Sequence, residues 1–547
     1  MGMARRHLPI AITALLWASA GARAQTPPPP ALKPLMRSFA AYARDVDRLD
    51  QLWLEPGRAQ QPEPLPQLPA PAASALPQQP GEVTIEQRLR VNLEQALSLA
   101  VQNDPELQQQ IAGVKEQEGW VRSVRGRLYP VFGLDLGASY SQLATANWAW
   151  QGNGAIPAYG PTSPFYVPTG GWSRAQTNVG SGFGQLRLDY ELLSFERSAA
   201  LAEVNAQLDQ SRQAYGNRLR QLQLDVSEAY YRLQLADQLR RIRQVVVEND
   251  TIILDQVQAM KTVGLVPRVD LLRAQARLQQ ERFRLQQAEA LRLSAQRRLS
   301  NLVNVPFAVT IESAQGVMLQ PPWPLDLEQT IVRGFKDNPQ LQALQAARTA
   351  LLRQADRSAA QLLPRIGLFA TGGYQAEQIT SPVIDLNGCC KGPALIPGLN
   401  GQATDWSAGV LLNWRVFDAG ITAGAVAATR AAAERTLQQE ASTRNTIRQR
   451  LESAYYDHRA ALSQIIAANA SYLAAREAYR DSRARYEFGL ADYTDLVDTI
   501  QSLTTAMEQR AEAMTLANLS YAQLLRELLP VPKQPGGVVT LPYTLAD

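Results

Sequence analysis

Four stretches of the chain alternate between apolar and polar residues, which is the pattern of a β-strand with two different faces. They fall at 132–140, 185–192, 366–375 and 406–416. Each is about 9–11 residues long, as a tilted strand that crosses a bilayer would be. An amphipathic sheet on a soluble core would alternate in the same way, but aromatic residues at the strand ends favour a membrane. The apolar positions are Phe132, Leu134, Leu136, Ala138 and Tyr140, then Leu186, Leu188, Tyr190 and Leu192, then Ile366, Leu368, Ala370 and Tyr374, and last Trp406, Ala408, Val410, Leu412, Trp414 and Val416.

Long stretches without proline follow each pair of strands and predict very long helices. No proline occurs from Phe195 to Val266, and a helix of about 60 residues would be about 90 Å long. In the second half, apolar residues recur at spacings of three and four from 451 to 479 and again from 496 to 528. This 3.5-residue period predicts supercoiled helices. The stripe is rich in Ala and Tyr, which suits a wall of side-by-side helices better than a two-stranded zipper.

The chain repeats itself in order. Asn103–Leu107 recurs as Asp337–Leu341, 234 residues later, and Ala229–Tyr231 recurs as Ala454–Tyr456, 225 residues later. We interpret this as a tandem duplication of roughly 210–220 residues. Each half is expected to hold a short helix (about 92–125 and 326–359), a strand, a long irregular segment (about 141–182 and 376–404), a second strand and two very long helices joined by a turn.

The domain boundaries follow from these patterns. Residues 1–24 are predicted to be a signal peptide, because Arg5 and Arg6 precede an apolar run that ends at an Ala-x-Ala site. A proline-rich extension would span 25–91 and the first repeat 92–303. A linker at 304–325, the second repeat at 326–529 and a tail at 530–547 complete the chain.

Composition removes several classes of function. The net charge is +4, and three of the basic residues lie in the signal peptide, so no basic patch indicates nucleic acid. The two cysteines, Cys389 and Cys390, are adjacent and offer no disulfide framework or metal spacing. His458 lies on the helical stripe and is interpreted as a packed residue. We therefore predict no catalytic residue, no metal, no cofactor and no enzymatic activity.

Four membrane strands are too few to make a pore. About eight strands is the smallest practical barrel, and lipid does not tolerate open sheet edges. A chain with four such strands must therefore assemble with copies of itself. Three copies would supply twelve strands.

The duplicated plan resembles the TolC-like outer-membrane factor family over about Leu93 to Leu529. The most specific match is the turn from Tyr486 to Asp498, whose first-half copy is Met260 to Leu272. The Asn-Asp-Pro-Glu-Leu segment at 103–107 also resembles the family's opening helix. The resemblance implies a mainly α fold with a membrane β-barrel: a homotrimer that shares a 12-strand β-barrel in outer-membrane lipid and an α-helical barrel in the periplasm.

The function that the resemblance implies is a passive channel-tunnel of the outer membrane, with most of the chain in the periplasm. It would export small molecules or proteins that arrive from an inner-membrane ABC or RND-type transporter through a periplasmic adaptor. The alternative is a periplasmic coiled-coil scaffold or adaptor without a pore, which would explain the helices but not four two-faced strands. The sequence does not name the cargo.

The resemblance also assigns roles near the turns. Asp495 and Asp498 fall where the family places inward-facing carboxylates at the periplasmic aperture, and rings of carboxylates select cations. Acids at the start of a helix are also stabilising without any such role. Tyr486 matches a tyrosine of the closed iris, but Ala491 stands where the family has a basic residue. The remaining turn positions are Gly489, Gly264, Asp270 and Arg273, and Arg273 could pair with Asp495 or Asp498 across helices.

Overall fold

A computed structural model describes residues 70–72, 74, 76–148, 172–386, 390–393 and 399–530. The predicted signal peptide, most of the proline-rich extension and the tail from 531 lie outside the described residues. Cys389 and the middle of both predicted irregular segments lie outside them as well. The boundaries drawn for those parts of the chain therefore stay predictions.

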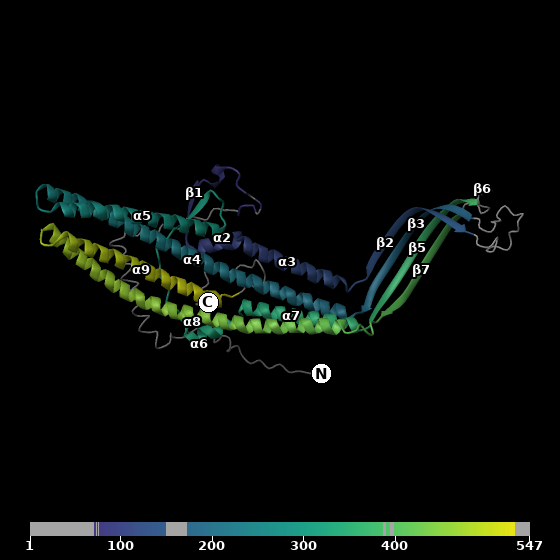
Figure 1. Ribbon diagram of the computed structural model, residues 1–547. Coiled ribbons are helices and arrows are strands. Elements are labelled where there is room, and N and C mark those ends of the chain that lie inside the picture. The colour runs from purple at the N-terminus through teal and green to yellow at the C-terminus, as the bar shows by residue number, and fades with distance from the viewer. Residues whose placement is uncertain are drawn as a thin grey trace, which may run out of the picture. The chain divides into compact units, whose positions relative to one another are not determined.

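The order of elements repeats in the two halves, as the duplicated sequence predicted (Figure 1). Two short helices, two long strands and two very long helices follow one another twice. The first set is α2 (Leu93–Asn103), α3 (Pro105–Gly126), β2 (Val131–Trp148), β3 (Trp172–Leu193), α4 (Phe195–Thr262) and α5 (Arg268–Val303). The second set is α6 (Leu327–Phe335), α7 (Pro339–Ala359), β5 (Arg365–Leu386), β7 (Leu399–Asn413), α8 (Ile421–Glu487) and α9 (Tyr493–Leu528), and the minor elements are η1 (Pro80–Val83), β1 (Gln87–Val91), β4 (Val309–Ser313), η2 (Ala360–Leu362) and β6 (Cys390–Pro393).

The single short helix predicted in each half is wrong, because a proline divides it. In the first half α2 ends at Asn103 and α3 begins at Pro105. Asp104 between them has an extended backbone, as a residue before proline prefers, and its carboxylate accepts a hydrogen bond from the Leu107 N–H at 2.5 Å. In the second half the break lies between α6 and α7, where Pro339 begins the second helix.

The strands are longer than the sequence patterns predicted. They span 18 residues in β2, 22 in β3 and β5, and 15 in β7, against a predicted 9–11. Much of each segment predicted to be irregular is strand, from 141 to 148 and from 172 to 182 in the first half. The fourth strand ends at Asn413, so Trp414 and Val416 follow it. The apolar alternation marks only the part of each strand that has two different faces.

The long strands form one antiparallel sheet in the order β2-β3-β5-β7, and short β6 also pairs with β5 beyond the end of β7. Strands β2 and β7 each pair on one side only within the described part of the chain. The sheet therefore has two edges whose backbone groups lack strand partners.

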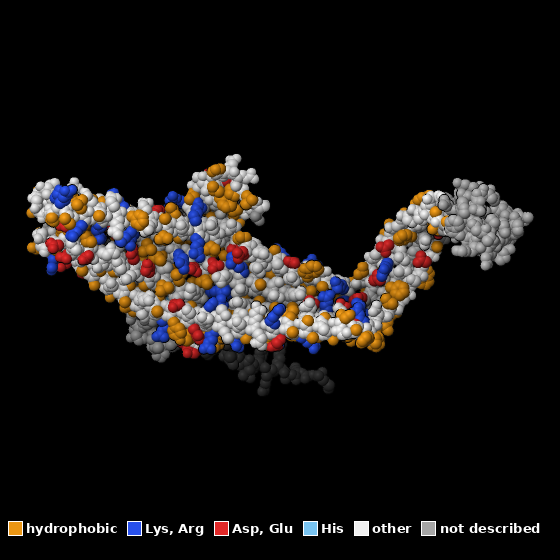
Figure 2. Space-filling model, viewed as in Figure 1, with side chains coloured by type: hydrophobic (Ala, Val, Ile, Leu, Met, Phe, Trp, Pro, Cys, Tyr) orange, Lys and Arg blue, Asp and Glu red, His pale blue; other side chains and the backbone are white. Residues whose placement is uncertain are grey.

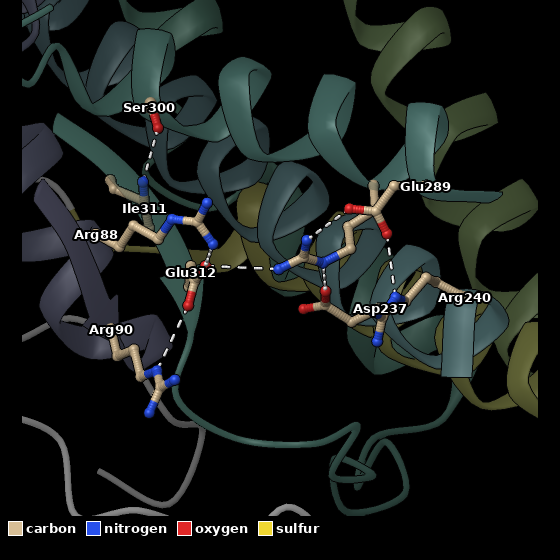
Figure 3. A network of polar contacts seen from close by, with 9 residues as sticks. Arg88, Arg90, Asp237, Arg240, Glu289, Ser300, Ile311 and Glu312 are labelled. Atoms are coloured by element: carbon tan, nitrogen blue, oxygen red, sulfur yellow. Dashed lines mark hydrogen bonds and ion pairs between the residues drawn. The ribbon is translucent and has the colours of Figure 1, made fainter. Parts of the chain in front are cut away.

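A two-stranded parallel ribbon of β1 and β4 was missed, because its strands were assigned to the extension and the linker. Figure 3 shows how it is tied to the first long hairpin. Glu312 of β4 lies 3.5 Å from Arg292 of α5, and Arg292 also binds Asp237 of α4 at 2.7 Å. The same glutamate faces Arg88 and Arg90 of β1 at 3.5 and 3.4 Å. One network of charges thus fixes the ribbon to both helices of the hairpin.

The fold divides into two compact units, and each unit takes segments from both repeats. One unit comprises 110–214 and 340–442 and contains the long sheet. The other comprises 1–109, 215–339 and 443–547, and contains the β1-β4 ribbon and the turn ends of both helical hairpins. The compact units therefore do not coincide with the sequence repeats.

His458 is a core residue, as the sequence analysis predicted. It is 2 % exposed, and its Nε2 accepts a hydrogen bond from the backbone N–H of Trp323 at 3.3 Å. Its Nδ1 lies 3.2 Å from the Ala517 carbonyl oxygen, so the neutral tautomer with hydrogen on Nδ1 satisfies both contacts. Burial lowers the pKa of His458 to about 4. The imidazole thus joins the linker to α8 and α9.

Candidate functional site

The long sheet exposes a continuous apolar face. Phe132 is 78 % exposed, and Leu134 and Leu136 on the same face are exposed too. The face continues across the strands because the partners are in register: Leu134 faces Leu186, which faces Gly372, which faces Trp406. Figure 2 shows hydrophobic side chains along these strands. Exposed apolar side chains at successive positions of one sheet face are typical of a surface that contacts lipid or another protein.

The opposite face of the sheet carries polar side chains that hydrogen-bond to one another, and Phe183 and Phe369 also lie on it, over Gly137 and Gly409. Ser139 and Ser181 share a hydrogen bond of 2.7 Å across β2 and β3, and Thr371 and Ser407 share one of 2.7 Å across β5 and β7. On the same face of β3, Arg187 pairs with Asp189 at 2.6 Å. The two faces therefore differ in chemistry along all four strands, as the alternation predicted.

Along β2 the large side chains of the apolar face extend from Phe132 to Tyr140. Tyr140 is its last large apolar residue before Gln142, which donates to Asn178 at 3.0 Å on the same side of the sheet. The apolar stretch from Phe132 to Tyr140 thus spans nine residues and ends in a tyrosine followed by polar pairs. A band of about this height is what the hydrocarbon core of an outer membrane requires.

Two matching turns close the far ends of the helical hairpins. Gly264 after α4 and Gly489 after α8 have φ angles of +78° and +71°, which only glycine adopts without strain. In each turn the next residue, Leu265 or Leu490, donates its N–H to a carbonyl five residues back, at 2.9 and 2.8 Å. This is the Schellman arrangement, and it explains why both repeats keep Gly-Leu at this point.

A cluster of tyrosines and aliphatic side chains packs the two hairpins together behind the turns. Tyr486 of α8 is 4 % exposed and meets Tyr493 of α9 edge to face, with the ring centroids 6.2 Å apart. Among the described residues, the Tyr486 hydroxyl has no hydrogen-bond partner. Burial, and then the nearby Asp270 carboxylate, raises its pKa. The cluster includes Ile253 and Val257 of α4, Ala274 of α5, Tyr472 and Tyr479 of α8, and Leu496, Ile500, Leu503 and Ala506 of α9.

The structure separates the predicted acids into two kinds. Asp495 and Asp498 are both exposed and three residues apart on α9, so they lie on one face of the helix. Asp270, the first-half counterpart of Asp495, is only 17 % exposed and lies 3.6 Å from Arg273 of its own helix. The ion pair of Arg273 in this structure thus lies within α5, and the suggested pair of Arg273 with Asp495 or Asp498 stays a prediction. The second repeat offers accessible carboxylates at its turn and the first does not.

The sequence analysis missed the apolar surface of the turns themselves. Leu490 is 77 % exposed, and Phe488 and Leu265 are equally open to solvent. Val263, Val269 and Leu272 are more than half exposed around the first turn. The signal was present, since large apolar residues flank both turn glycines, but the family resemblance assigned roles to the acids, the glycines and Tyr486 instead. Apolar side chains at the tips of two hairpins form a contact surface.

Neither a metal-binding cluster nor a membrane-spanning helix occurs among the described residues. No group of three or more His, Cys, Asp or Glu side chains there is placed to hold a metal ion. No helix in the described ranges has a stretch both long and apolar enough to cross a membrane. The candidate site thus consists of the two-faced sheet and the hairpin turns.

The sequence matches one protein family over most of its length. The outer membrane efflux protein family matches residues 96–305 and 334–528, which are the two repeats. The chain is also similar to protein CyaE of Bordetella pertussis, with 28 % identity over 287 residues. That alignment covers 51 % of this chain and 54 % of CyaE, so the chain spans about half the length of the curated relative it matches.

Solved structures share the fold at low sequence identity. The outer-membrane protein VceC of Vibrio cholerae aligns with a TM-score of 0.61 and 17 % identity, over 80 % of this chain and 95 % of its own. The outer-membrane channel OprN gives a TM-score of 0.61 at 18 % identity, over 80 % and 89 %. The CmeC outer-membrane channel of Campylobacter jejuni gives 0.60 at 15 % identity, over 80 % and 85 %. These alignments establish the architecture of the chain.

Proposed function

The chain belongs to the outer membrane efflux protein family, and from this premise we propose that it forms a passive export duct through the outer membrane. The observation that carries the proposal is the apolar face that runs unbroken across β2, β3, β5 and β7. In water such a face would aggregate, whereas in lipid it is stabilised. A periplasmic scaffold without a pore has no use for it.

The open edges of the sheet support assembly from identical copies. Each unpaired backbone group of β2 and β7 would cost several kcal/mol in hydrocarbon. Three chains, joined through these edges, give a closed barrel of twelve strands. The polar face of the sheet then lines the lumen, and the long helices continue the tunnel into the periplasm. At 1.5 Å per residue, α4 with 68 residues reaches about 100 Å.

Substitutions on the two faces of β2 test this duct directly. We expect Leu136→Arg to prevent stable insertion, because an Arg near the bilayer midplane costs about 2–4 kcal/mol and a trimer carries three. Ser139→Arg, three residues away on the polar face, should still insert as a trimer. The readouts are the trimer band of outer-membrane fractions on mild electrophoresis and ion conductance in planar bilayers. Equal loss or equal retention of both variants, or a native chain that is monomeric and non-conducting, would contradict the proposal.

The hairpin turns are proposed to bind a periplasmic adaptor, which would deliver cargo from an inner-membrane ABC or RND-type transporter. Exposed Phe488, Leu490 and Leu265 support this, because apolar tips on long helices offer a docking surface with few polar groups to desolvate. Export of small molecules, of proteins or of both is compatible with such a duct.

Adaptor docking predicts a position-specific crosslink. A photo-reactive residue at Leu490 should capture a periplasmic adaptor in cells, and Leu265→Ser combined with Phe488→Ser should reduce that capture at least tenfold, by roughly 1.4 kcal/mol or more of lost apolar burial. The same probe at the exposed Asp457, remote from the turns on α8, is the control. Equal capture from both positions would argue against docking at the turns.

A further inference from the structure

Every junction between the long sheet and its helices exposes large apolar side chains. The four junctions join α3 to β2, β3 to α4, α7 to β5 and β7 to α8, and all of them lie in one compact unit. Figure 2 shows hydrophobic side chains where the strands meet the helices. Because the four strands are neighbours in one antiparallel sheet, these side chains form a belt at its helical end, which we call the junction belt. Its exposed residues are Leu128, Tyr129, Leu192, Leu193, Phe195, Leu363, Trp414, Val416, Phe417 and Ile421.

The connection from β7 to α8 carries the most exposed part of the junction belt. In the first repeat β3 passes to α4 through Ser194 alone, whereas the second repeat uses residues 414–420. Phe417 in that connection is 83 % exposed, and Ile421 at the start of α8 is 74 % exposed. The second repeat therefore has an additional apolar segment that the chain itself does not cover.

Hydrogen bonds hold this connection in place. The indole Nε1 of Trp414 donates to the Leu362 carbonyl oxygen at 3.0 Å. The Asp418 carboxylate accepts a hydrogen bond from the Thr422 N–H at 2.8 Å, at the start of α8. The connection is thus fixed at both ends while it keeps Phe417 in the open, an arrangement that water disfavours and an apolar medium stabilises.

Lipid accounts for the whole junction belt, whereas a second copy of the chain accounts for part of it. Trp414 directly follows β7 and keeps the alternation of Trp406 and Leu412, so it continues the face that the proposed duct turns to lipid. Copies joined through the β2 and β7 edges would cover the junctions of those two strands. Leu192 at the end of β3 and Leu363 before β5 belong to the inner strands. In a closed ring, lipid is the medium adjacent to all four junctions.

Exposed arginines accompany the apolar residues of the junction belt. Arg125 and Arg127 precede β2, and Arg415 follows β7. The acid at the start of α4, Glu196, is paired with Arg365 at 3.3 Å. Basic side chains next to exposed apolar ones match the headgroup layer of an anionic phospholipid leaflet, where phosphates lie just outside the acyl chains. The junction belt therefore offers positive charge at the depth of lipid phosphates.

We propose that the junction belt binds the headgroup layer of a leaflet that contains anionic phospholipid. Phe417 and Ile421 lie among the upper parts of the acyl chains, and Arg415 lies beside the phosphates. This inference rests on the proposed duct, since it takes the apolar face of the sheet to be in lipid. It adds a contact beyond the strands and a preference for lipid charge, neither of which the duct itself requires.

Photo-capture of lipid tests the contact. A photo-reactive phenylalanine analogue at Phe417 alters an exposed ring, so the full chain should fold and reconstitute as the native chain does. In vesicles of phosphatidylethanolamine and phosphatidylglycerol, illumination should attach phospholipid to the chain, which mass spectrometry of the intact chain detects. The same analogue at Phe183 is the matched control, because that ring is 50 % exposed on the opposite face of the sheet and should capture little lipid.

The outcomes separate this inference from the duct. An analogue at Leu136, on the apolar face of the sheet, should capture lipid if the duct is right. Capture at Leu136 together with a chain-to-chain crosslink at Phe417, or with no lipid at Phe417, overturns the junction contact and leaves the duct standing. No capture at Leu136, or equal lipid capture at Leu136 and Phe183, contradicts the duct itself.

The preference for lipid charge has its own variant. In vesicles of phosphatidylcholine and phosphatidylglycerol, the adducts at Phe417 should be enriched in phosphatidylglycerol about fivefold over its share of the lipid, the factor that one basic residue near an anionic surface contributes. Arg415→Gln should remove most of that enrichment. Arg430→Gln should not, because Arg430 is exposed on α8 about 14 Å beyond Ile421, which exceeds the Debye length of about 8 Å. Adducts in proportion to the lipid mixture, or unchanged enrichment in Arg415→Gln, overturn the binding of anionic headgroups.

Discussion

Replacing Asp495 and Asp498 together by asparagine is expected to weaken the block of the proposed channel by divalent cations about tenfold and to reduce its preference for cations. Both carboxylates are exposed on one face of α9 beside the turn. In a trimer they become six negative charges around one axis. A divalent cation on that axis would be attracted by all six at once.

The size of the effect follows from Coulomb's law. A divalent ion about 10 Å from one carboxylate in water gains about 0.83 kcal/mol, which falls to about 0.24 kcal/mol with screening at physiological salt. Six such terms sum to about 1.4 kcal/mol, or a factor of ten in affinity. Planar-bilayer recordings of block by Mg²⁺ at two salt concentrations would measure it, and the effect should shrink at high salt.

Asp457→Asn provides a control for this experiment. Asp457 is an exposed carboxylate on α8, far along the chain from the turn, so its substitution removes one negative charge per chain, half of what the double variant removes, without altering the proposed ring. Its block should match that of the native chain. If the double variant and the control give the same block, Asp495 and Asp498 do no more than stabilise the start of α9.

Acid should destabilise the protein through His458 by about 3 kcal/mol per chain between pH 6.5 and pH 4. Burial lowers the pKa of this imidazole to about 4, against 6.5 in an unfolded chain. The folded state therefore resists protonation, and the stability that the neutral ring contributes is complete above pH 6.5 and lost as the pH falls through 4. Structurally, a proton on Nε2 would oppose the Trp323 N–H that now donates to it.

The measurement compares Tm against pH for the native chain and His458→Gln. The difference between the two curves should change by roughly 3 °C over this window. The two proteins must be compared because Asp250 acts in the opposite direction. Burial raises the pKa of Asp250 to about 6. Its contribution to stability is therefore present below about pH 4 and is lost as the pH rises through 6. Parallel curves for the two proteins would show that His458 does not titrate with unfolding.

Local periodicity predicted the repeated elements well, because each depends on residues close in sequence. The alternation of Phe132, Leu134 and Leu136 identified a strand with one apolar face, and the absence of proline after Phe195 indicated the long helix. The turn glycines were recognised from their repeated context. Their positive φ angles and matching hydrogen bonds explain that recurrence.

The parts that were missed depend on contacts between distant residues or on competing local rules. Strand β1 pairs with β4, so Leu89 faces Ile311. No sequence pattern around either residue predicts this pairing. The apolar and polar residues cease to alternate in the far parts of β3 and β5, so the alternation could not predict how far these strands extend. The break at Asp104 could have been predicted from Pro105, which disfavours a helical conformation in the residue before it.

The strand directions decide how neighbouring chains can join. The sheet runs β2-β3-β5-β7 with every pair antiparallel, so its first and last strands point in opposite directions. When β7 of one copy meets β2 of the next, the seam repeats the antiparallel geometry found inside each chain. Such head-to-tail joints are heterologous and are satisfied only when the ring closes. Completion of the membrane part therefore waits for the last copy of the ring, and a free peptide copying β2 should arrest it by occupying the β7 edge of a half-built ring.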